Sequence, residues 1–158
     1  MLDFTLDGVP LLYNGQEVDD PLPTSWRRVV PIHWPPTDRA EAGTAGETLE
    51  RYTKLFHLRA TEPTLAEGEV VWVNNSAPES VVSFLRRNGS AEVVVIVNLS
   101  NRRTPVTVDL PVMDYSSVEN LLEPGATNFS LYSGRVSAEL PAFGFVVGRK
   151  IPLAKLRQ

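Results

Sequence analysis

Three acidic side chains, Glu17, Asp19 and Asp20, are the group in this sequence whose type and spacing could best support acid–base chemistry. One carboxyl group can donate a proton while a neighbouring carboxylate accepts one, which is the pairing that general acid–base catalysis needs. No other group in the sequence completes a site with these three residues. We therefore favour the structural alternative, in which Glu17 is a hydrogen-bonded loop carboxylate beside two solvated aspartates.

The two histidines, His33 and His57, are the candidate metal ligands. A zinc site needs three or four His, Cys or carboxylate ligands, and neither histidine has further ligands at a workable spacing. The sequence contains no cysteine, no Gly-x-Ser-x-Gly elbow and no glycine-rich phosphate loop. We therefore predict no metal site and no cofactor.

The tryptophans are candidates for sugar binding, because the face of an aromatic ring can stack on the apolar side of a pyranose. Trp34 and Trp26 lie in a proline-rich loop and are the predicted substrate-binding residues, with plain loop packing as the alternative. Trp72 stands between Val71 and Val73 in an apolar run. We expect it to be a sandwich or interface residue.

The elements that position these residues are mostly strands. Apolar and β-branched runs separated by turn signals follow one another over residues 69–74, 81–86, 92–99, 106–110, 118–122, 135–140 and 143–147. Asn88-Gly89 predicts a tight hairpin between the second and third runs. The nearly continuous run 92–99 indicates a central strand covered on both faces. We expect the last two runs to pair around Pro141-Ala142, and the whole to form an antiparallel β-sandwich of Greek-key type.

Residues 1–62 follow a different pattern. Helical spacing of apolar residues predicts one amphipathic helix over 47–62, with a capping box formed by Thr44 and Glu47 and a stop at Pro63. Residues 8–13 resemble a buried strand, although Pro10 disfavours an ordinary central strand. Residues 21–43 are rich in proline and have no period. One strand, one loop and one helix cannot bury their own apolar faces, so we expect this segment to be the tail of a larger domain.

Composition narrows the class of protein. The chain has 158 residues, 42% hydrophobic and 22% charged, with a net charge of −4. It can therefore form a core, and it lacks the basic surface that nucleic-acid binding needs. No apolar run reaches the length of a membrane span, and the first residues have no basic region of a signal peptide. We predict neither a nucleic-acid nor a membrane partner. The absence of cysteine fits the cytosol without excluding secretion, so the compartment stays open.

Five residues near the start form a recognisable pattern. Gly8, Pro10, Tyr13, Gly15 and Glu17 follow the spacing Gly-x-Pro-x-x-Tyr-x-Gly-x-Glu. This resembles a segment of the alpha-amylase family of glycoside hydrolases, which in that family follows the last strand of the (β/α)₈ catalytic barrel. Residues 52–60 and 63–68 resemble its last barrel helix and exit, and residues 84–87, 93–100 and 140–147 resemble strands of its C-terminal sandwich.

The resemblance implies a division of the chain. Residues 1–62 would be the last βα unit of an incomplete (β/α)₈ barrel, residues 63–150 the C-terminal antiparallel β-sandwich, and residues 151–158 a tail. The five motif residues would form a structural barrel-end motif. In the family, an aromatic residue is common at the position of Asn14, and Asp at that of Gln16. Neither departure helps to choose a substrate.

The resemblance also implies what the chain lacks. The family's nucleophile Asp, acid Glu, stabilising Asp and His-Asp pair lie before the Gly-x-Pro segment, and no such motifs occur here. We thus expect a non-catalytic portion of a glycosidase or glucan-remodelling enzyme, called the parent enzyme below, which cleaves or transfers α-glucosidic bonds with retention. The isolated chain should be inactive.

The expected partners follow from the same resemblance. The parent enzyme would act on an α-glucan or oligosaccharide. The chain would meet the missing catalytic barrel, or a second copy of itself, through residues 1–62. A free-standing carbohydrate-binding sandwich and a protein-interaction module remain alternatives.

Overall fold

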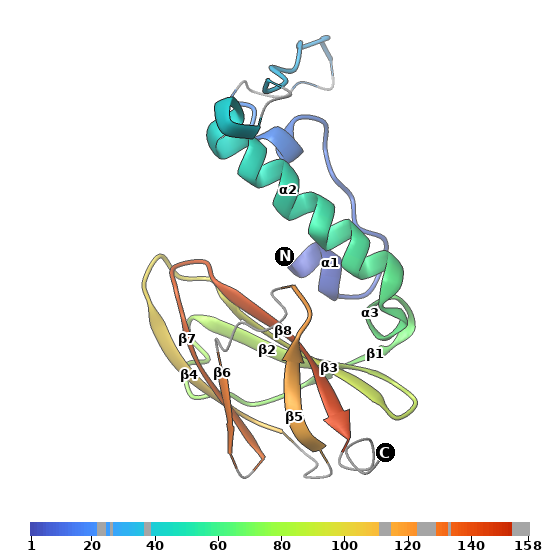
Figure 1. Cartoon of the computed structure of the whole chain (residues 1–158), viewed down its shortest axis with the longest axis vertical. Coiled ribbons are helices and arrows are strands. Elements are labelled where there is room, and N and C mark those ends of the chain that lie inside the picture. Colours follow the sequence, from blue (N-terminus) through green and yellow to red (C-terminus); the bar gives the residue numbers. More distant parts are fainter. Residues whose placement is uncertain are drawn as a thin grey trace.

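A helical part and a two-layer β part make up the chain (Figure 1). The computed structural model describes residues 1–21, 25, 27–36, 39–110, 115–122, 129–132 and 134–152. The helices come first along the chain: α1 (Leu2–Thr5), the 3₁₀ turn η1 (Gln16–Val18), α2 (Arg39–Thr61) and α3 (Pro63–Glu67). In the part of the chain that is described, no helix has the length and hydropathy needed to cross a bilayer.

Two antiparallel sheets form the β part. The larger sheet has the order β1 (Glu69–Trp72), β2 (Val81–Asn88), β3 (Ala91–Asn98), β8 (Phe145–Pro152) and β5 (Tyr115–Asn120). The smaller sheet has the order β4 (Thr104–Asp109), β7 (Arg135–Leu140) and β6 (Phe129–Tyr132). The predicted antiparallel β-sandwich is confirmed. β6 was not predicted from the sequence. β8 extends to Pro152, so it includes the first two residues of the predicted tail. Residues 153–158 lie outside the described residues.

The predicted hairpin between β2 and β3 is confirmed, but its central turn residues are Gly89 and Ser90, because Asn88 is the last residue of β2. Asn88 pairs with Ala91 at the end of the ladder, and Gly89 has a φ of 59°. A side chain at this φ would be strained, which explains why glycine follows asparagine here.

The predicted pairing of residues 135–140 with 143–147 is wrong. β7 pairs with β4 and β6, whereas β8 pairs with β3 and β5 in the other sheet. The burial patterns explain the difference, because β7 alternates between buried and exposed residues while Val146 and Val147 of β8 are both buried. A strand solvated on one face and a strand covered on both faces belong to different sheets.

The connection between β7 and β8 is a tight corner. Gly144 N–H donates to the carbonyl of Pro141 at 2.9 Å, and Phe143 has a φ of 55°. The buried Asn98 side chain donates from Nδ2 to the carbonyls of Pro141 at 2.8 Å and Arg102 at 2.7 Å. These bonds fix the chain where it crosses from one sheet to the other.

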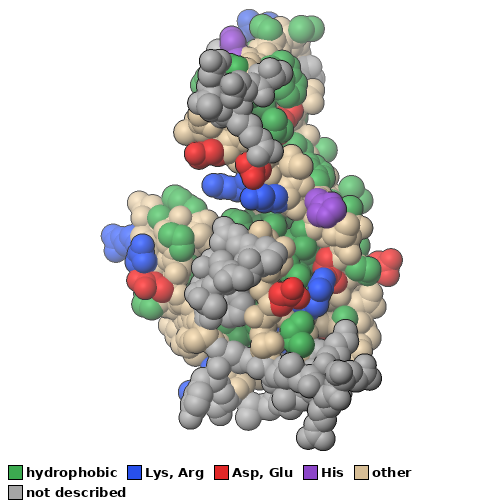
Figure 2. All heavy atoms as spheres, in the orientation of Figure 1, with side chains coloured by type: hydrophobic (Ala, Val, Ile, Leu, Met, Phe, Trp, Pro, Cys, Tyr) green, Lys and Arg blue, Asp and Glu red, His purple; other side chains and the backbone are tan. Residues whose placement is uncertain are grey.

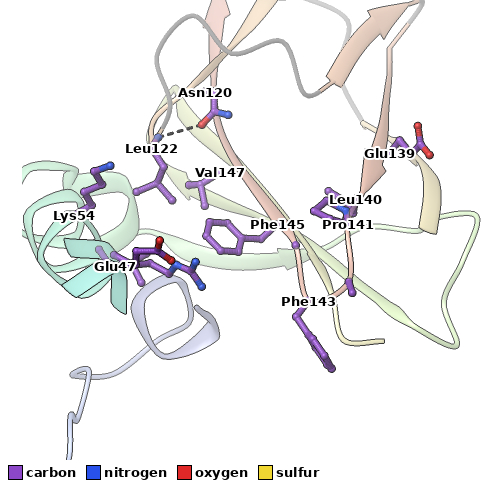
Figure 3. A pocket seen from close by; sticks show the side chains of 14 residues that line it. Glu47, Lys54, Asn120, Leu122, Glu139, Leu140, Pro141, Phe143, Phe145 and Val147 are labelled. Atoms are coloured by element: carbon purple, nitrogen blue, oxygen red, sulfur yellow. Dashed lines mark hydrogen bonds between the residues drawn. The ribbon is translucent and has the colours of Figure 1, made fainter. Parts of the chain in front are cut away.

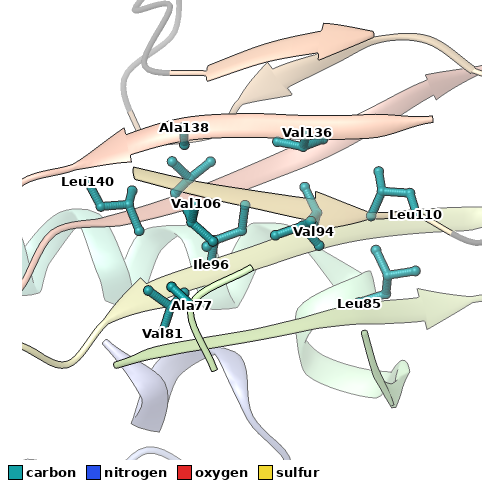
Figure 4. Packing of buried hydrophobic residues seen from close by; sticks show 12 residues of the cluster. Ala77, Val81, Leu85, Val94, Ile96, Val106, Leu110, Val136, Ala138 and Leu140 are labelled. Carbon is teal, nitrogen blue, oxygen red and sulfur yellow. The ribbon is translucent and has the colours of Figure 1, made fainter. Parts of the chain in front are cut away.

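The space between the two sheets holds the first apolar cluster, here called the sandwich core (Figure 4). Its buried members are Ala77, Val81, Leu85, Val94, Ile96, Val106, Val108, Leu110, Val136, Ala138, Leu140 and Val146.

A second cluster, here called the helix–sheet core, lies on the outer face of the larger sheet. Its buried members are Leu58, Leu65, Phe84, Val93, Val95, Val97 and Val147, with Met1, Leu2 and Leu6 packed against them. Alternate residues of β3 therefore point into opposite cores. This confirms the prediction that the 92–99 run is covered on both faces.

Two helical features differ from the sequence prediction. α2 begins before the predicted range of 47–62 and has a kink at Gly43 (φ 54°, ψ −139°), next to the predicted capping residue Thr44. Pro63 ends α2 as expected but also opens α3, because proline is tolerated in the first turn of a helix. Glu62 caps α3 by accepting from Thr64 N–H at 3.1 Å.

The buried strand predicted over residues 8–13 is absent. Residues 9–13 have no regular secondary structure, and Val9 and Leu11 are 93% and 83% exposed. A strand needs a neighbouring strand for its hydrogen bonds, and within the described residues none lies beside this segment.

Candidate functional site

Tyr13, Gly15 and Glu17 of the barrel-end motif lie in a compact turn over residues 13–20, here called the motif loop. Tyr13 N–H donates to Gln16 Oε1 at 2.9 Å, and Gly15 N–H donates to Glu17 Oε2 at 2.9 Å. Gly15 has a φ of 95°, and a Cβ there would lie 3.2 Å from Cβ of Asp20. The loop therefore requires glycine at this position, and Glu17 serves as a hydrogen-bonded loop carboxylate.

The other acidic residues of the loop have separate environments. Asp20 accepts from the backbone N–H of His33 at 3.2 Å and lies 3.4 Å from its Nδ1. Asp19 is exposed, and so is His57 on α2. Among the described residues, no group of three His, Cys, Asp or Glu side chains gathers closely enough to hold a metal ion. Asp20 is therefore hydrogen-bonded to His33, whereas Glu17 is hydrogen-bonded to the backbone of its own loop.

Of the two predicted sugar-binding tryptophans, the structure describes only Trp34, and its side chain is largely exposed. Trp34 is 62% exposed in the loop that follows the motif loop, and Trp26 lies outside the described residues. Trp72 is 65% exposed, and its ring centroid lies 5.4 Å from that of Phe84. Of the remaining motif residues, Gly8 is exposed with a φ of 95°, Pro10 is half-buried and Tyr13 is exposed.

Arg59 connects α2 to the first residues of the chain. Its Nη1 donates to the carbonyl of Leu6 at 2.9 Å, and its Nη2 donates to the carbonyl of Gly8 at 2.7 Å. Burial first, and the neighbouring Arg86 guanidinium second, lower the pKa of Arg59. Arg59 therefore holds the segment that enters the motif against α2.

Arg86 connects the same segment to the sandwich. Its side chain is only 1% exposed, and its Nη1 donates to the carboxylate of Asp7, which is itself 72% exposed. Within the described residues, Arg86 Nε has no hydrogen-bond partner. Sequence reasoning missed this pair because the two residues are 79 positions apart and neither belongs to the motif.

One ion pair joins the helical part to the larger sheet, and another group ties strands of that sheet together. The buried Glu62 carboxylate, between α2 and α3, accepts from Arg149 of β8. Within the sheet, Glu92 of β3 accepts from Arg87 of β2 at 2.7 Å and from Lys150 of β8. Burial by itself raises the pKa of the Glu62 carboxyl, but the hydrogen bonds from Arg149 and Thr64 outweigh it, and the net pKa lies below its ordinary value. The pKa of Glu92 is lowered in the same way against the effect of burial.

A groove of about 720 Å³ opens between α2 and the corner of the sandwich, and is here called the corner groove (Figure 3). Glu47, Arg51, Lys54 and Leu55 of α2 line one side, and Asn120, Leu122 and residues 139–145 with Val147 line the other. The face shown in Figure 2 has acidic and basic side chains next to one another where the helical part meets the sandwich. Sequence patterns did not predict this groove, because its lining comes from three segments that are far apart along the chain.

Comparisons with known proteins show which proteins have a similar fold. No family model matches the chain. A probable alpha-glucosidase of Rhizobium meliloti (strain 1021) is 27% identical over 96 residues, which are 61% of this chain and 17% of that protein.

Solved structures match more of the chain. A noncanonic maltogenic alpha-amylase from Thermotoga neapolitana superposes with a TM-score of 0.73 at 23% identity, over 95% of this chain and 34% of that one. An Anoxybacillus alpha-amylase gives a TM-score of 0.72 at 22% identity, over 96% of this chain and 31% of that one. A debranching enzyme from Nostoc punctiforme gives a TM-score of 0.61 at 21% identity, over 93% of this chain and 29% of that one.

The chain spans 17% of the curated relative and about a third of these solved structures. Both the helical part and the sandwich are included in the match, because it covers nearly the whole chain. The chain has the fold of the C-terminal part of alpha-amylase family enzymes, the family that its barrel-end motif resembles.

Proposed function

We propose that the chain serves as the non-catalytic C-terminal portion of an alpha-amylase-like enzyme acting on α-glucosidic bonds, with the β-sandwich stabilising the catalytic barrel. Residues 1–62 supply the last βα unit of that barrel, and residues 63–150 form the sandwich behind it. The relatives named above support the substrate class.

The contrast between the two sides of α2 carries this proposal. One side, with Leu55 and Leu58, is buried, and Leu58 belongs to the helix–sheet core on the sandwich. The other side leaves Leu49 and Phe56 39% and 42% exposed. Phe56 packs edge-on against Phe4 of α1, with the ring centroids 4.8 Å apart, and still keeps this exposure. Apolar surface of this kind is typical of an interface.

The segment before the motif loop supports the same conclusion. Val9 and Leu11 are 93% and 83% exposed, although they belong to a run of apolar residues. In a (β/α)₈ barrel, such a run is a strand covered by its neighbours on both sides. We infer that further strands of the barrel cover these residues in the working enzyme.

The acidic residues support a non-catalytic role. A retaining glycosidase needs two carboxyl groups roughly 5–5.5 Å apart across the scissile bond. Glu17 accepts from the backbone of its own loop, and Asp20 accepts from His33. Both carboxylates are engaged in hydrogen bonds within or next to the motif loop, which supports a structural contribution of the chain.

A reducing-sugar assay tests the proposal. The purified chain should release no product from soluble starch. A fusion in which it replaces the matching C-terminal third of the Thermotoga neapolitana amylase should hydrolyse starch. The matched controls are the amylase truncated at the same point and a fusion carrying Leu65→Ala in the helix–sheet core, which should lose thermal stability. Starch hydrolysis by the chain alone would overturn the proposal.

Association with a second copy is the alternative that the same exposed surface favours. If the exposed apolar residues normally pack against the rest of a barrel, the isolated chain should self-associate at high concentration. Replacing Val9 and Leu11 by Ser should shift its elution in size-exclusion chromatography toward the monomer. A discrete, stable dimer that survives this double substitution would instead favour a dedicated interaction module.

A further inference from the structure

We propose that Asn88 is a site of spontaneous deamidation, at which the β2–β3 hairpin acquires a mixture of aspartate and isoaspartate, and that the fold holds the same reaction back at Asn14. Both residues precede a glycine. Asparagine is a thermolabile side chain, and a following glycine hinders its reaction with the main chain least, because glycine has no Cβ. This inference does not depend on the proposed function.

The reaction joins the asparagine side chain to the next peptide group. The amide nitrogen of Gly89 loses its proton to hydroxide and attacks Cγ of Asn88. The Cγ–Nδ2 bond then breaks, and Nδ2 leaves as ammonia after taking up a proton from water. Water opens the resulting five-membered succinimide. Opening at Cγ gives aspartate, and opening at the main-chain carbonyl gives isoaspartate, whose main chain runs through Cβ and Cγ.

Both reacting groups are accessible in the hairpin. Asn88, Gly89 and Ser90 are exposed, and a Cβ on Gly89 would have no atom within 4 Å. In Figure 1 the turn projects into solvent at one end of the larger sheet. No described residue accepts a hydrogen bond from the N–H of Gly89, and none bonds to the side-chain amide of Asn88. Neither group therefore has to give up a protein contact before it reacts.

The backbone of Asn88 can also move at low cost. Ring closure brings Cγ of Asn88 to the next nitrogen, so this residue must leave the ladder for a moment. Asn88 and Ala91 are the last pair of the β2–β3 ladder, next to the turn. Only this terminal pair has to open, and the ends of an element open more readily than its interior.

Asn14 has the same neighbour in the sequence but a different environment. The N–H of Gly15 donates to Glu17 Oε2 at 2.9 Å. This hydrogen bond must break before the nitrogen can react, and the negative carboxylate opposes formation of the amide anion. Because a hydrogen bond to a charged group has this strength, Asn14 should react roughly tenfold more slowly than Asn88.

Other asparagines of the described chain are held more firmly. The side chains of Asn75, Asn98 and Asn120 all take part in hydrogen bonds with neighbouring residues. Each of the three is followed by a residue that is larger than glycine. Their amides are therefore less able to reach the next main-chain nitrogen.

The isoaspartate product alters the hairpin. It adds one carbon atom to the main chain and a negative charge at position 88. The pair between this residue and Ala91 cannot keep its geometry with a longer main chain. Hydrogen exchange at the end of the β2–β3 ladder should therefore become faster as conversion proceeds.

Mass spectrometry of the folded chain, incubated in mildly alkaline buffer, tests the proposal. Cleavage after glutamate releases residues 80–92, in which Asn88 is the only side-chain amide, and residues 1–17, in which Asn14 is the only asparagine. The first peptide should gain the mass difference between a hydroxyl and an amino group roughly tenfold faster than the second. An isoaspartyl methyltransferase with labelled S-adenosylmethionine should label the first peptide.

Two variants and one solvent are the matched controls. Asn88→Gln keeps an amide but would need a larger ring, so it should stop the mass gain in residues 80–92 and leave residues 1–17 unchanged. Glu17→Gln removes the negative charge next to Gly15 and should accelerate conversion of Asn14. In urea, both Asn-Gly pairs lose their surroundings and should convert at similar rates.

Absence of a mass gain in residues 80–92 of the unaltered chain would overturn the proposal. Conversion of Asn14 as fast as that of Asn88 in the folded chain would do the same. An equally large difference between the two sites in urea would show that the fold does not protect Asn14. These measurements use the unaltered chain, so they decide the question even if Glu17→Gln fails to fold.

Discussion

The two apolar clusters of this molecule lie on opposite faces of the same strands, yet they are closed in different ways. The sandwich core lies between two sheets, and among the described residues three partly buried ones, Val71, Val73 and Val118, surround its 12 buried members. The helix–sheet core is covered by α1, α3 and the end of α2, and eight partly buried residues of the described chain, Leu2, Leu6 and Phe145 among them, surround its seven buried members. The first cluster holds the β part together, and the second attaches a helical part that still has exposed apolar surface.

Truncation of a central side chain should have the largest effect. Leu85 and Leu65 are both fully buried, one in each core. Leu85→Ala should lower the free energy of unfolding by about 2–5 kcal/mol, measured by urea denaturation followed by circular dichroism. Leu65→Ala should cost less, because the surrounding helices can move inward to reduce the cavity. An equal loss of stability in both variants would show that the two cores are equally rigid.

Acidification should weaken the helix–sheet attachment next. Because the pKa of Glu62 in the folded chain lies below its ordinary value of 4.5, its carboxylate stabilises the folded state above that value. This contribution is lost as the pH falls through the folded-state pKa. Thermal melts from pH 7 to pH 3 should show falling stability, and the pH dependence should be smaller in Glu62→Gln. At pH 7 this variant should itself lose about 1.5–3 kcal/mol, the usual worth of hydrogen bonds to a charged group.

Loss of the Asp7 carboxylate should have a smaller effect. Asp7 is 72% exposed, so its bond to the buried Arg86 is screened by water on one side. Asp7→Asn should cost about 1 kcal/mol and should increase hydrogen exchange at residues 1–8 more than in the strands. Uniform acceleration of exchange across the sandwich would contradict this local role. Asp3→Asn, at another exposed carboxylate of the same segment, is the matched control.

Substitution of the exposed apolar residues should have the smallest effect on stability. Val9→Ser and Leu11→Ser should each change the free energy of unfolding by less than about 0.5 kcal/mol, because water already surrounds both side chains. A destabilisation as large as that of Leu65→Ala would mean that residues 9–13 pack against the rest of the chain. The two regions would then differ less than the structure indicates.

The sequence was informative where local patterns decide structure. Alternation, β-branched runs and the Asn88-Gly89 turn located most strands, and the apolar spacing around Leu55 located the main helix. These signals arise within ten or so residues of the chain. The barrel-end motif also pointed to the fold that the solved structures share.

The predictions that failed concern contacts between residues far apart in the sequence. Pairing partners of β7 and β8 depend on which face each strand buries, and neighbouring segments were wrongly joined. The Asp7–Arg86 bond and the corner groove link residues separated by tens of positions, which no local pattern encodes. Residues 9–13 have the composition of a buried strand, but composition cannot supply the neighbours that a strand requires.

One feature of β3 has a consequence for how the chain reaches its fold. Val93, Val94, Val95, Ile96 and Val97 are apolar on both faces, so sliding the strand by one position would exchange valine for valine or isoleucine. In a strand with one solvent-exposed face, such a slip would move apolar residues into water and polar residues into the core. No such cost opposes the slip in this run of β3. The correct alignment must then be set by the ends of the strand, through the Gly89 turn and the Asn98 side chain. Changes at Gly89 or Asn98 should therefore produce misregistered, aggregation-prone sheets more readily than changes at any valine between them.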